Sequence, residues 1–388
     1  MPRAPHTAAR LESIGGSVFE RHLPRIRAAA TRPVKLHIGD ASDPPNHGLP
    51  IEENFREINP HWYQYPHTSG VRRLRFALAE YHQREHGLDT DVEQVLVTAG
   101  ATNALSATVQ SLIDPGDEVV VPTPSWPFFR GMVSMAGGIV REVPLYTLDS
   151  PHEALQAIED AIGPKTSAIY LNTPNNPSGR VLDVATRREL LELAERRDLW
   201  VISDEAYDGM AFDERTTKPL ALYAARPENV ISTYTFSKVH RFAGLRLGWV
   251  RASADVVRAI DRALVHTVYS ASSLAQEMMI EPVRTRRQWA PVVRADLQVR
   301  RDGFVAALDL PIRPCEGTYF VFLDAAEYCG PSRNPEQLLV ECMDEGVLVA
   351  PGADFGADFG TWIRACFAAE PRPTAEEAAR RLRRVLTR

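Results

Sequence analysis

Short runs of apolar and β-branched residues alternate with helix-like stretches from about Val92 to Val250. The runs are apolar on both faces, as in parallel strands that are covered by helices on both sides. This alternation predicts one doubly wound α/β sheet. The expected strands are Gln94 to Val97, Glu118 to Val121, Ile139 to Val143, Ser167 to Leu171, Trp200 to Ser203, Ile231 to Tyr234 and Leu247 to Val250.

Turn residues separate these runs. Asp114 to Asp117 (DPGD) and Gly163 to Thr166 (GPKT) are typical of turns that enter strands, and Asn175 to Gly179 (NNPSG) is typical of a loop that leaves one. Open α/β sheets bind their ligands at loops that leave strands. We therefore expect a ligand site near NNPSG and its neighbours.

The pattern changes after Ala275, where a stretch rich in Arg and Glu runs to about Ala307 with helical spacing and predicts one connecting helix. The chain has 388 residues, more than the roughly 250 to 300 residues at which a single hydrophobic core stops growing. We therefore expect a second, smaller α/β unit after this helix. Its expected elements are the strands Gly317 to Asp324 and Thr361 to Ala368 and a helix at Glu336 to Glu345. The expected division is an N-terminal segment (1–44) that joins this unit, a large domain (45–285) and a small domain (286–388).

Composition excludes several classes of protein. The chain is 44% hydrophobic and 24% charged, as in ordinary globular proteins, and its net charge of −6 with scattered basic residues predicts no nucleic-acid partner. No apolar run approaches the roughly 20 residues of a membrane helix, so we expect a cytoplasmic protein without a membrane partner. The four cysteines form no CxxC pair, so neither a disulfide framework nor a metal site is expected.

The segment Phe236 to Trp249 (FSKVHRFAGLRLGW) carries the most informative chemistry, since no dinucleotide or P-loop motif is present. Only four of the 44 basic residues are lysines, and one of them, Lys238, follows a strand. An amine can lose its proton and attack a carbonyl carbon, whereas a guanidinium stays charged. Arg246, eight residues later, suits a phosphate group through two parallel hydrogen bonds. Taken alone, such a pair more often lies on a solvated loop.

Two further strand ends carry polar residues. Asp204 ends an apolar strand in ISDEAYDGM and is followed by Tyr207. A carboxylate buried there needs a cation or hydrogen bonds, and a protonated pyridine nitrogen is such a cation. Asn175 and Asn176 end another strand in NTPNNPSG, where an Asx turn or a helix cap is the alternative explanation.

Four motifs of this chain resemble, in their order and spacing, those of the class I and II aminotransferases, which are fold type I enzymes that use pyridoxal 5′-phosphate (PLP). The motifs are NNPSG, SDEAY, FSK with AGLRLG, and the late IR. The resemblance begins at KLHIGD (Lys35 to Asp40) and ends at WIRACFA (Trp362 to Ala368). It implies an enzyme with PLP as cofactor that moves an amino group between an L-amino acid and a 2-oxo acid. The implied fold is a large domain with a mostly parallel seven-stranded sheet and a smaller α/β domain.

The resemblance also implies a role for each matching residue. Lys238 forms the internal aldimine and then acts as the base at the substrate's Cα, and Asp204 pairs with the pyridinium nitrogen. Tyr207 and Asn176 donate hydrogen bonds to the phenolic oxygen. Trp126, in TPSWPFF, stacks on the pyridine ring and, like Asn176, contacts the substrate. The implied phosphate-binding residues are Gly100, Ala101, Thr102, Thr235, Ser237 and Arg246.

The remaining matches concern the substrate and a second subunit. Gly39 lies where the N-terminal segment closes over the substrate in the family, and Arg364 matches the arginine that binds the α-carboxylate as a planar fork. Tyr65, in YQYPHTSG, matches the tyrosine that reaches the phosphate of the neighbouring subunit, so a homodimer with shared active sites is implied. His240 and Arg241 depart from the family, which often has an aromatic or small residue after the lysine, and no role follows for them.

Two alternatives fit the same motifs. Another PLP enzyme on this scaffold, such as a carbon–sulfur lyase, a decarboxylase or an amino-acid oxidising or cyclising enzyme, would keep the same Lys, Asp and Arg. Only a transaminase must cycle through the pyridoxamine form of the cofactor. A regulator with an aminotransferase-like domain would carry a DNA-binding domain ahead of it, whereas about 34 residues precede KLHIGD. The amino donor and the oxo-acid acceptor do not follow from the motifs.

Overall fold

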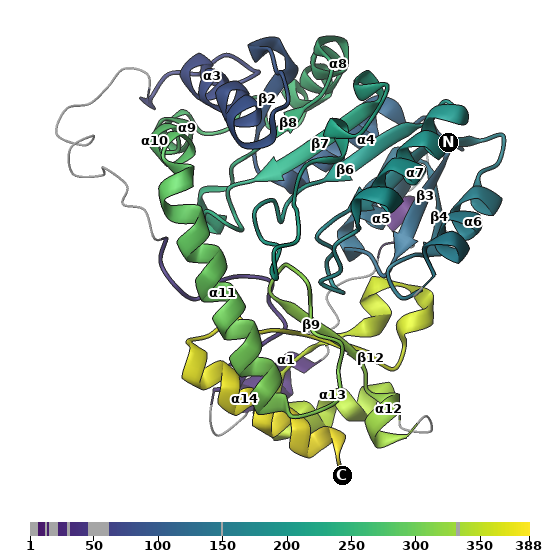
Figure 1. Ribbon diagram of the computed structural model, residues 1–388, viewed down its shortest axis with the longest axis vertical. Helices are drawn as coiled ribbons and strands as arrows, with labels where there is room; N and C mark the ends of the chain where they lie inside the picture. Colours follow the sequence, from purple (N-terminus) through teal and green to yellow (C-terminus); the bar gives the residue numbers. More distant parts are fainter. Residues whose placement is uncertain are drawn as a thin grey trace, which may run out of the picture.

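The computed structural model describes residues 7–11, 14, 22–28, 32–45, 62–148, 150–330 and 334–388, and Figure 1 shows two α/β bodies joined by a long helix. The larger body contains a seven-stranded sheet in the order β2-β8-β7-β6-β5-β3-β4. All the strands that the sequence predicts for this sheet are present. Their bounds are β2 (Val95–Thr98), β3 (Glu118–Thr123), β4 (Ile139–Pro144), β5 (Thr166–Asn172), β6 (Trp200–Asp204), β7 (Val230–Thr235) and β8 (Gly248–Arg251).

The sheet is mostly parallel. Only β8 runs against its neighbours, since it pairs in antiparallel register with both β7 and β2, while the pairs among β3, β4, β5, β6 and β7 are all parallel. The carboxyl ends of the parallel strands and the beginning of β8 therefore lie at the same end of the sheet.

Helices cover both faces of this sheet (Figure 1). Successive residues of a strand point to opposite faces, and Val119, Val120 and Val121 of β3 are all fully buried. Val119 and Val121 pack in one apolar cluster and Val120 in another, which shows that both faces are closed. One face carries α4 (Ala101–Leu112), α5 (Pro127–Ala136) and α8 (Ala254–Val265), and the other carries α3 (Arg72–Tyr81), α6 (Pro151–Ala161) and α7 (Val184–Arg196).

The smaller body holds an antiparallel sheet in the order β11-β12-β9. A parallel pair joins β1, near the N-terminus, to β10, and an ion pair of 2.6 Å links Arg25 on α1 to Asp344 on α13. The stretches α1 and β1 of the N-terminal segment thus pack on the smaller body, whereas η1 (Ala9–Leu11) contacts α5 of the larger body. The elements are α1 (Leu23–Ala28), β1 (Val34–Lys35), β9 (Phe320–Asp324), α12 (Ala326–Cys329), α13 (Pro335–Asp344), β10 (Val347–Leu348), β11 (Ala350–Pro351), β12 (Trp362–Cys366) and α14 (Arg372–Leu386).

The connecting segment differs from the sequence prediction of one helix. It forms three helices, α9 (Ser273–Met278), α10 (Ile280–Arg284) and α11 (Arg286–Leu308). Pro282 explains the first break, because a proline has no amide hydrogen and its ring clashes with the carbonyl of the residue four positions earlier, here the last residue of α9. The long helix α11 then runs from the larger body to the smaller one and packs on α14 (Figure 1).

Short helical turns complete the described part of the chain. They are η1 (Ala9–Leu11), the π-helical η4 (His82–His86), η5 (Val92–Gln94), η6 (Leu220–Leu222), η7 (Pro227–Asn229), η8 (Ala243–Leu245), η9 (Gly352–Phe355) and η10 (Ala357–Phe359). None of the helices within the described ranges combines the length and apolar character that crossing a bilayer requires.

Candidate active site

The strand ends that carry the candidate residues meet at one end of the seven-stranded sheet. Asp204, which ends β6, lies between its sheet partners Asn172 on β5 and Thr233 on β7. The first residue of β8, Gly248, pairs with Thr235 at the end of β7 and with the end of β2. Because these strands lie side by side, the loops that leave β2, β5, β6 and β7 converge on one site.

Lys238 lies in the loop that follows β7. Its Nζ donates a hydrogen bond to the backbone oxygen of Gly39 (2.7 Å), which also accepts one from the hydroxyl of Tyr319 (3.0 Å). Burial lowers the pKa of Lys238 to about 8, although the charge of Asp40 opposes this shift. A lysine with this pKa supplies a neutral amine near pH 7 more readily than an exposed lysine does.

The carboxylate of Asp204 is buried and hydrogen bonded to neutral donors. The hydroxyl of Tyr170 donates to Oδ2 (2.7 Å) and the amide of Ala206 donates to Oδ1 (3.0 Å). Burial raises the pKa of Asp204 to about 6, although these two hydrogen bonds and the charge of Lys238 act in the opposite direction. A cation placed against this carboxylate would lower its pKa and keep it ionised at neutral pH.

The raised pKa of Asp204 predicts how the stability of the PLP-free protein depends on pH. The folded pKa of about 6 exceeds the ordinary aspartate pKa of 3.8, so between these pH values the folded state binds the proton more tightly than the unfolded state does. Stability from this group is therefore fully present below about pH 4 and is lost as the pH rises through 6, by about 3 kcal/mol. Urea unfolding between pH 4 and pH 7 should show a larger loss in the wild type than in Asp204→Asn. Parallel pH curves for the two proteins would contradict the prediction.

Arg364 on β12 brings the smaller body into the site. Its Nη1 donates to Oδ1 of Asn176 (2.8 Å) and its Nη2 to the backbone oxygen of His37 (2.7 Å), while Cζ lies 4.2 Å from the ring centre of Phe320. Burial lowers the pKa of Arg364 and raises the pKa of Tyr207 beside it. Within the described part of the chain Nε of Arg364 is buried without a hydrogen-bond partner. The Nε–H of the guanidinium therefore remains for an anionic ligand, beside the second N–H of each Nη.

The first turn of α4 and Arg246 form an arrangement that suits an anion. Gly100 caps α4 with a φ of 87°, and a Cβ on it would lie 2.9 Å from Nη2 of Arg246. A Cβ on Gly248 would lie 2.8 Å from the amide nitrogen of Ala101. The two glycines thus let the guanidinium and β8 approach the start of α4, where free amides and the helix dipole favour an anion. Thr102 is exposed in the same turn.

Thr235 and Ser237 extend this arrangement from the end of β7. The hydroxyl of Thr235 donates to Oγ of Ser237 (2.9 Å), and Nη1 of Arg246 lies 3.4 Å from the same oxygen. The structure therefore brings the candidate phosphate-binding residues at the start of α4, at the end of β7 and directly after η8 to the same end of the sheet.

The two candidate aromatic residues have different surroundings. Trp126 caps α5, is half-buried and has its ring centre 5.3 Å from that of Phe128. Tyr65 is 85% exposed, and its ring packs edge-on against Tyr269 with 5.1 Å between centres. Tyr65 is therefore not part of the buried cluster around Lys238.

The two departures from the family pattern have packing roles. His240 is buried, with its ring 4.8 Å from that of Phe236 and 4.9 Å from that of Trp289. Arg241 has a φ of 60°, and its Nη2 donates a hydrogen bond to Asp296 on α11 (2.9 Å). Both residues therefore stabilise the position of the loop that carries Lys238.

Several residues of the site are missing from the sequence prediction. Tyr170 holds Asp204, and Tyr319 shares the backbone oxygen that Lys238 contacts. Asn172 accepts a hydrogen bond from the amide of Asn176 (2.8 Å) and donates one to the backbone oxygen of Asp204 (2.9 Å). The position of Asn172 at a strand end could have identified it. Tyr170 and Tyr319 lie in apolar segments, where an aromatic residue is more typical of the core.

The chemistry of the site fits PLP. PLP carries an aldehyde, a ring nitrogen and a phosphate. The site holds a primary amine with a lowered pKa, a buried carboxylate with neutral donors, and an anion-binding helix start, all at one end of the sheet. The fold and this site define a PLP-dependent enzyme of fold type I.

Comparisons with known proteins lead to the same class. Residues 31–382 match the family model described as "Aminotransferase class I and II". The chain is 31% identical over 336 residues to the aspartate/prephenate aminotransferase of Thermus thermophilus, covering 84% of each protein. It is 32% identical over 327 residues to the arginine–pyruvate transaminase of Pseudomonas aeruginosa, covering 82% of this chain and 81% of the relative. The solved N-succinyldiaminopimelate aminotransferase of Mycobacterium tuberculosis has a TM-score of 0.86 at 28% identity, covering 98% of this chain and all of that one.

The chain therefore belongs to the class I and II aminotransferase family and is a PLP-dependent aminotransferase. The predicted fold class, cofactor and enzyme class are confirmed by these comparisons. The three relatives are named for different substrates. Similarity of this degree thus assigns the type of reaction and not the amino donor.

Proposed function

We propose that this enzyme transfers the amino group of an L-amino acid to a 2-oxo acid, with Lys238 as the residue that holds PLP and moves the proton. One observation carries this proposal. The amine of Lys238, the carboxylate of Asp204 and the guanidinium of Arg364 lie close enough that the charges of the last two act on the pKa of the first. An amine, a partner for a ring cation and a carboxylate receptor are the three groups that amino transfer requires.

Each residue has a defined task in this proposal. When bound, PLP supplies an electron sink that lowers the barrier to breaking a bond at the substrate's Cα. Asp204 keeps the ring nitrogen protonated, and Tyr207 and Asn176 bind the phenolic oxygen. Lys238 would act as the base that takes the proton from the substrate's Cα and transfers it to the cofactor. The residues that would hold the phosphate are Gly100, Ala101, Thr102, Thr235, Ser237 and Arg246, while Trp126 would pack against the ring and Gly39 would cover the substrate.

A spectroscopic titration tests the proposed reaction. The purified enzyme, loaded with PLP, is mixed in turn with each of the twenty common amino acids, and its visible absorption is followed. At least one amino acid should convert the cofactor to the pyridoxamine form, and a 2-oxo acid should reverse the change. Consumption of an amino acid with release of carbon dioxide or a thiol, and without the pyridoxamine form, would show a different PLP reaction.

Replacing Arg364 with lysine should lower kcat/KM for the amino acid about 10- to 100-fold while the PLP content stays normal. The planar guanidinium has a free Nε–H and a second N–H on each Nη, so it can bind a carboxylate at two points, whereas an ammonium is a single point charge. The expected loss corresponds to the roughly 1.5 to 3 kcal/mol of one hydrogen bond to a charged group. Steady-state kinetics and PLP quantification measure the two effects. Unchanged kinetics in Arg364→Lys would mean that another group binds the carboxylate.

We also propose a homodimer in which Tyr65 reaches the phosphate site of the partner subunit. The exposure of Tyr65 supports this proposal, because a large aromatic side chain that is 85% exposed suits an interface better than a monomer surface. Tyr63 and Tyr269 are also exposed, at 68% and 45%, and Tyr269 contacts the ring of Tyr65. These rings supply apolar area for a contact between two copies of the chain.

Mixing Tyr65→Ala with Lys238→Ala under conditions that exchange subunits tests the shared site. A hybrid dimer would have one site with both lesions and one with neither, so an equal mixture should regain about a quarter of the wild-type activity. The activity of each parent alone is the control. If hybrids form and the mixture shows no more activity than its parents, Tyr65 does not serve a partner's site.

We further propose the division into an N-terminal segment (1–44), a large domain (45–285) and a small domain (286–388). The pairing of β1 with β10 supports the first assignment, and the start of α11 at Arg286 supports the last boundary. A cytoplasmic location is proposed because four cysteines without a CxxC pattern need no oxidising compartment.

A further inference from the structure

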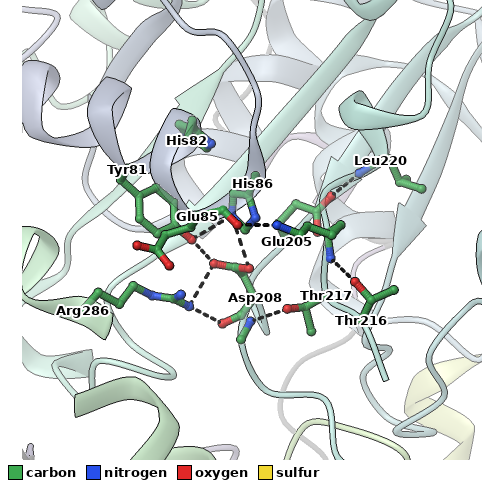
Figure 2. Close-up of polar contacts among 12 residues, drawn as sticks. Tyr81, His82, Glu85, His86, Glu205, Asp208, Thr216, Thr217, Leu220 and Arg286 are labelled. Atoms are coloured by element: carbon green, nitrogen blue, oxygen red, sulfur yellow. Dashed lines mark hydrogen bonds and ion pairs between the residues drawn. The ribbon is translucent and has the colours of Figure 1, made fainter. Parts of the chain in front are cut away.

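The segment 204–210 carries two sets of side chains with separate surroundings. Asp204 and Tyr207 belong to the active site described above. Glu205 and Asp208 instead have their own buried polar partners (Figure 2). Glu205, for example, accepts a hydrogen bond from the hydroxyl of Ser203 (2.6 Å). The segment is therefore held by residues that alternate with those proposed to act on the cofactor.

Asp208 lies at the centre of a buried group of four residues, Tyr81, His86, Asp208 and Arg286, which we call the Asp208 cluster (Figure 2). The hydroxyl of Tyr81 donates a hydrogen bond to Oδ2 of Asp208, and Nη2 of Arg286 lies 3.0 Å from the same oxygen. His86 Nε2 lies 3.6 Å from Oδ1. The side chains of Asp208, His86 and Arg286 are at most 8% exposed.

The surroundings of Asp208 keep it ionised. Burial alone would raise the pKa of its carboxyl, but the charge of Arg286 and the contacts of His86 and Tyr81 outweigh burial, and the pKa lies well below the usual range. A buried ion pair adds little net stability, because desolvation of both charges offsets their attraction. Removing one partner, however, leaves an uncompensated buried charge. The pair therefore strongly favours the one conformation in which both charges meet.

Arg286 also holds the backbone of the segment. Its Nη2 donates a hydrogen bond to the backbone oxygen of Asp208 (3.1 Å), and a Cβ on Gly209 would lie only 2.4 Å from that nitrogen. Gly209 has a φ of 79°, in the region that favours glycine. Its amide donates to the hydroxyl of Thr217 (3.0 Å). The two residues that follow Tyr207 are thus held by contacts from both sides.

The Asp208 cluster joins distant elements to this segment. Tyr81 is the last residue of α3, His86 is the last residue of η4 and Arg286 is the first residue of α11. Figure 1 shows α11 running to the smaller body, which carries Arg364 on β12. The backbone next to Tyr207 therefore contacts α11, the helix that leads to the smaller body and to Arg364.

We propose that Asp208 and Arg286 are positioning residues that hold Tyr207 and Asp204 in line with the cofactor, an inference that rests on the roles proposed above for these two residues. Asp208 adjoins Tyr207 in the chain, so a change in the backbone at Asp208 moves the Tyr207 side chain directly. A displacement of about 1 Å in a positioned group can lower a rate about 100-fold. The Asp208 cluster touches neither substrate nor cofactor in this scheme and acts only through the segment.

Asp208→Asn tests the proposal through three measurements. Hydrogen–deuterium exchange of the PLP-free protein should be about tenfold faster in peptides that cover residues 204–210, because the segment opens more easily. In the PLP-loaded protein, the pH midpoint of the visible absorption should rise by about 0.5 to 1 unit, since Tyr207 stabilises the deprotonated phenolic oxygen less well. The value of kcat/KM should fall about 10- to 100-fold.

Arg301→Met is the matched control. Arg301 is also a buried arginine of α11, and it forms an ion pair of 2.5 Å with Asp213, which lies after the segment 204–210. Its loss should lower the melting temperature and leave the exchange of residues 204–210 and the absorption midpoint at their wild-type values. An equal change in Arg301→Met and Asp208→Asn would overturn the proposal, because the effect would then reflect general destabilisation.

Tyr81→Phe provides a second variant that keeps the packing of the ring and removes only the hydroxyl that Asp208 accepts from. It should shift exchange and midpoint in the same direction by a smaller amount, and it decides the question if Asp208→Asn does not fold. Wild-type values in Tyr81→Phe and in any folded Asp208→Asn would overturn the proposal. A wild-type protein that bound no PLP would instead contradict the proposed function, while exchange in the PLP-free protein would still report on positioning.

Discussion

Replacing Lys238 with alanine is expected to abolish turnover, with a fall in kcat of about 10⁴-fold, while PLP still binds without a covalent bond. The variant loses both the amine that holds the cofactor and the base that moves the Cα proton, and proton transfer by a positioned base alone contributes about 10²- to 10⁴-fold. Gly100 at the start of α4 and Asp204 at the end of β6 lie outside the loop that carries Lys238, and Arg246 lies eight residues further along that loop, beside Gly100. The groups proposed to bind the phosphate and ring therefore survive the substitution.

Borohydride reduction followed by peptide mapping measures where the cofactor is attached. The wild type should carry the label on Lys238, and Lys238→Ala should carry none. Lys165→Ala is the control, because Lys165 is exposed and precedes β5 at the end of the sheet away from the site. It should keep both label and turnover. Label on Lys35, Lys165 or Lys218 in the wild type would show that the assignment is wrong.

Replacing Asp204 with alanine is expected to slow removal of the Cα proton about 10²- to 10³-fold while Lys238 remains attached to PLP. Without the carboxylate the ring nitrogen loses its negative partner, and a neutral pyridine is a poorer electron sink. The burial that raises the pKa of Asp204 also shows that little solvent reaches the carboxylate. Its charge is therefore screened weakly and acts strongly on the bound ring.

Single-turnover kinetics with an amino acid deuterated at Cα isolates this step. The isotope effect in Asp204→Ala should be larger than in the wild type, because proton removal then limits the rate. Tyr170→Phe is a graded comparison, since it removes one hydrogen bond from Asp204 and leaves the charge in place. It should slow the step by only about tenfold. A wild-type rate of Cα proton removal in Asp204→Ala would mean that Asp204 does not control the ring.

Most strands of the large sheet could be predicted because each is a short apolar run between turn residues, and burial on both faces leaves a pattern that needs no knowledge of the fold. The edge strand β4 is mostly exposed and was predicted from its β-branched residues alone. The same reasoning failed in the connecting segment. Helical spacing continues there from Ala275 to Ala307, although the backbone leaves the helix at Met279 and Thr285. Pro282 is the local signal for the first break, and periodicity alone does not register it.

The sequence by itself determined the chemistry available to this protein. Lys238 after a strand, Asp204 at a strand end and the order of the surrounding motifs predict the family and its cofactor. Only the tertiary structure decided which groups meet. Lys238 contacts the backbone of Gly39, 199 positions away. Asp204 contacts the hydroxyl of Tyr170, 34 positions away, and Asp208 pairs with Arg286 across 78 positions. Local patterns report burial and backbone direction, whereas a distant partner depends on strand order and helix packing, which exist only in the folded chain.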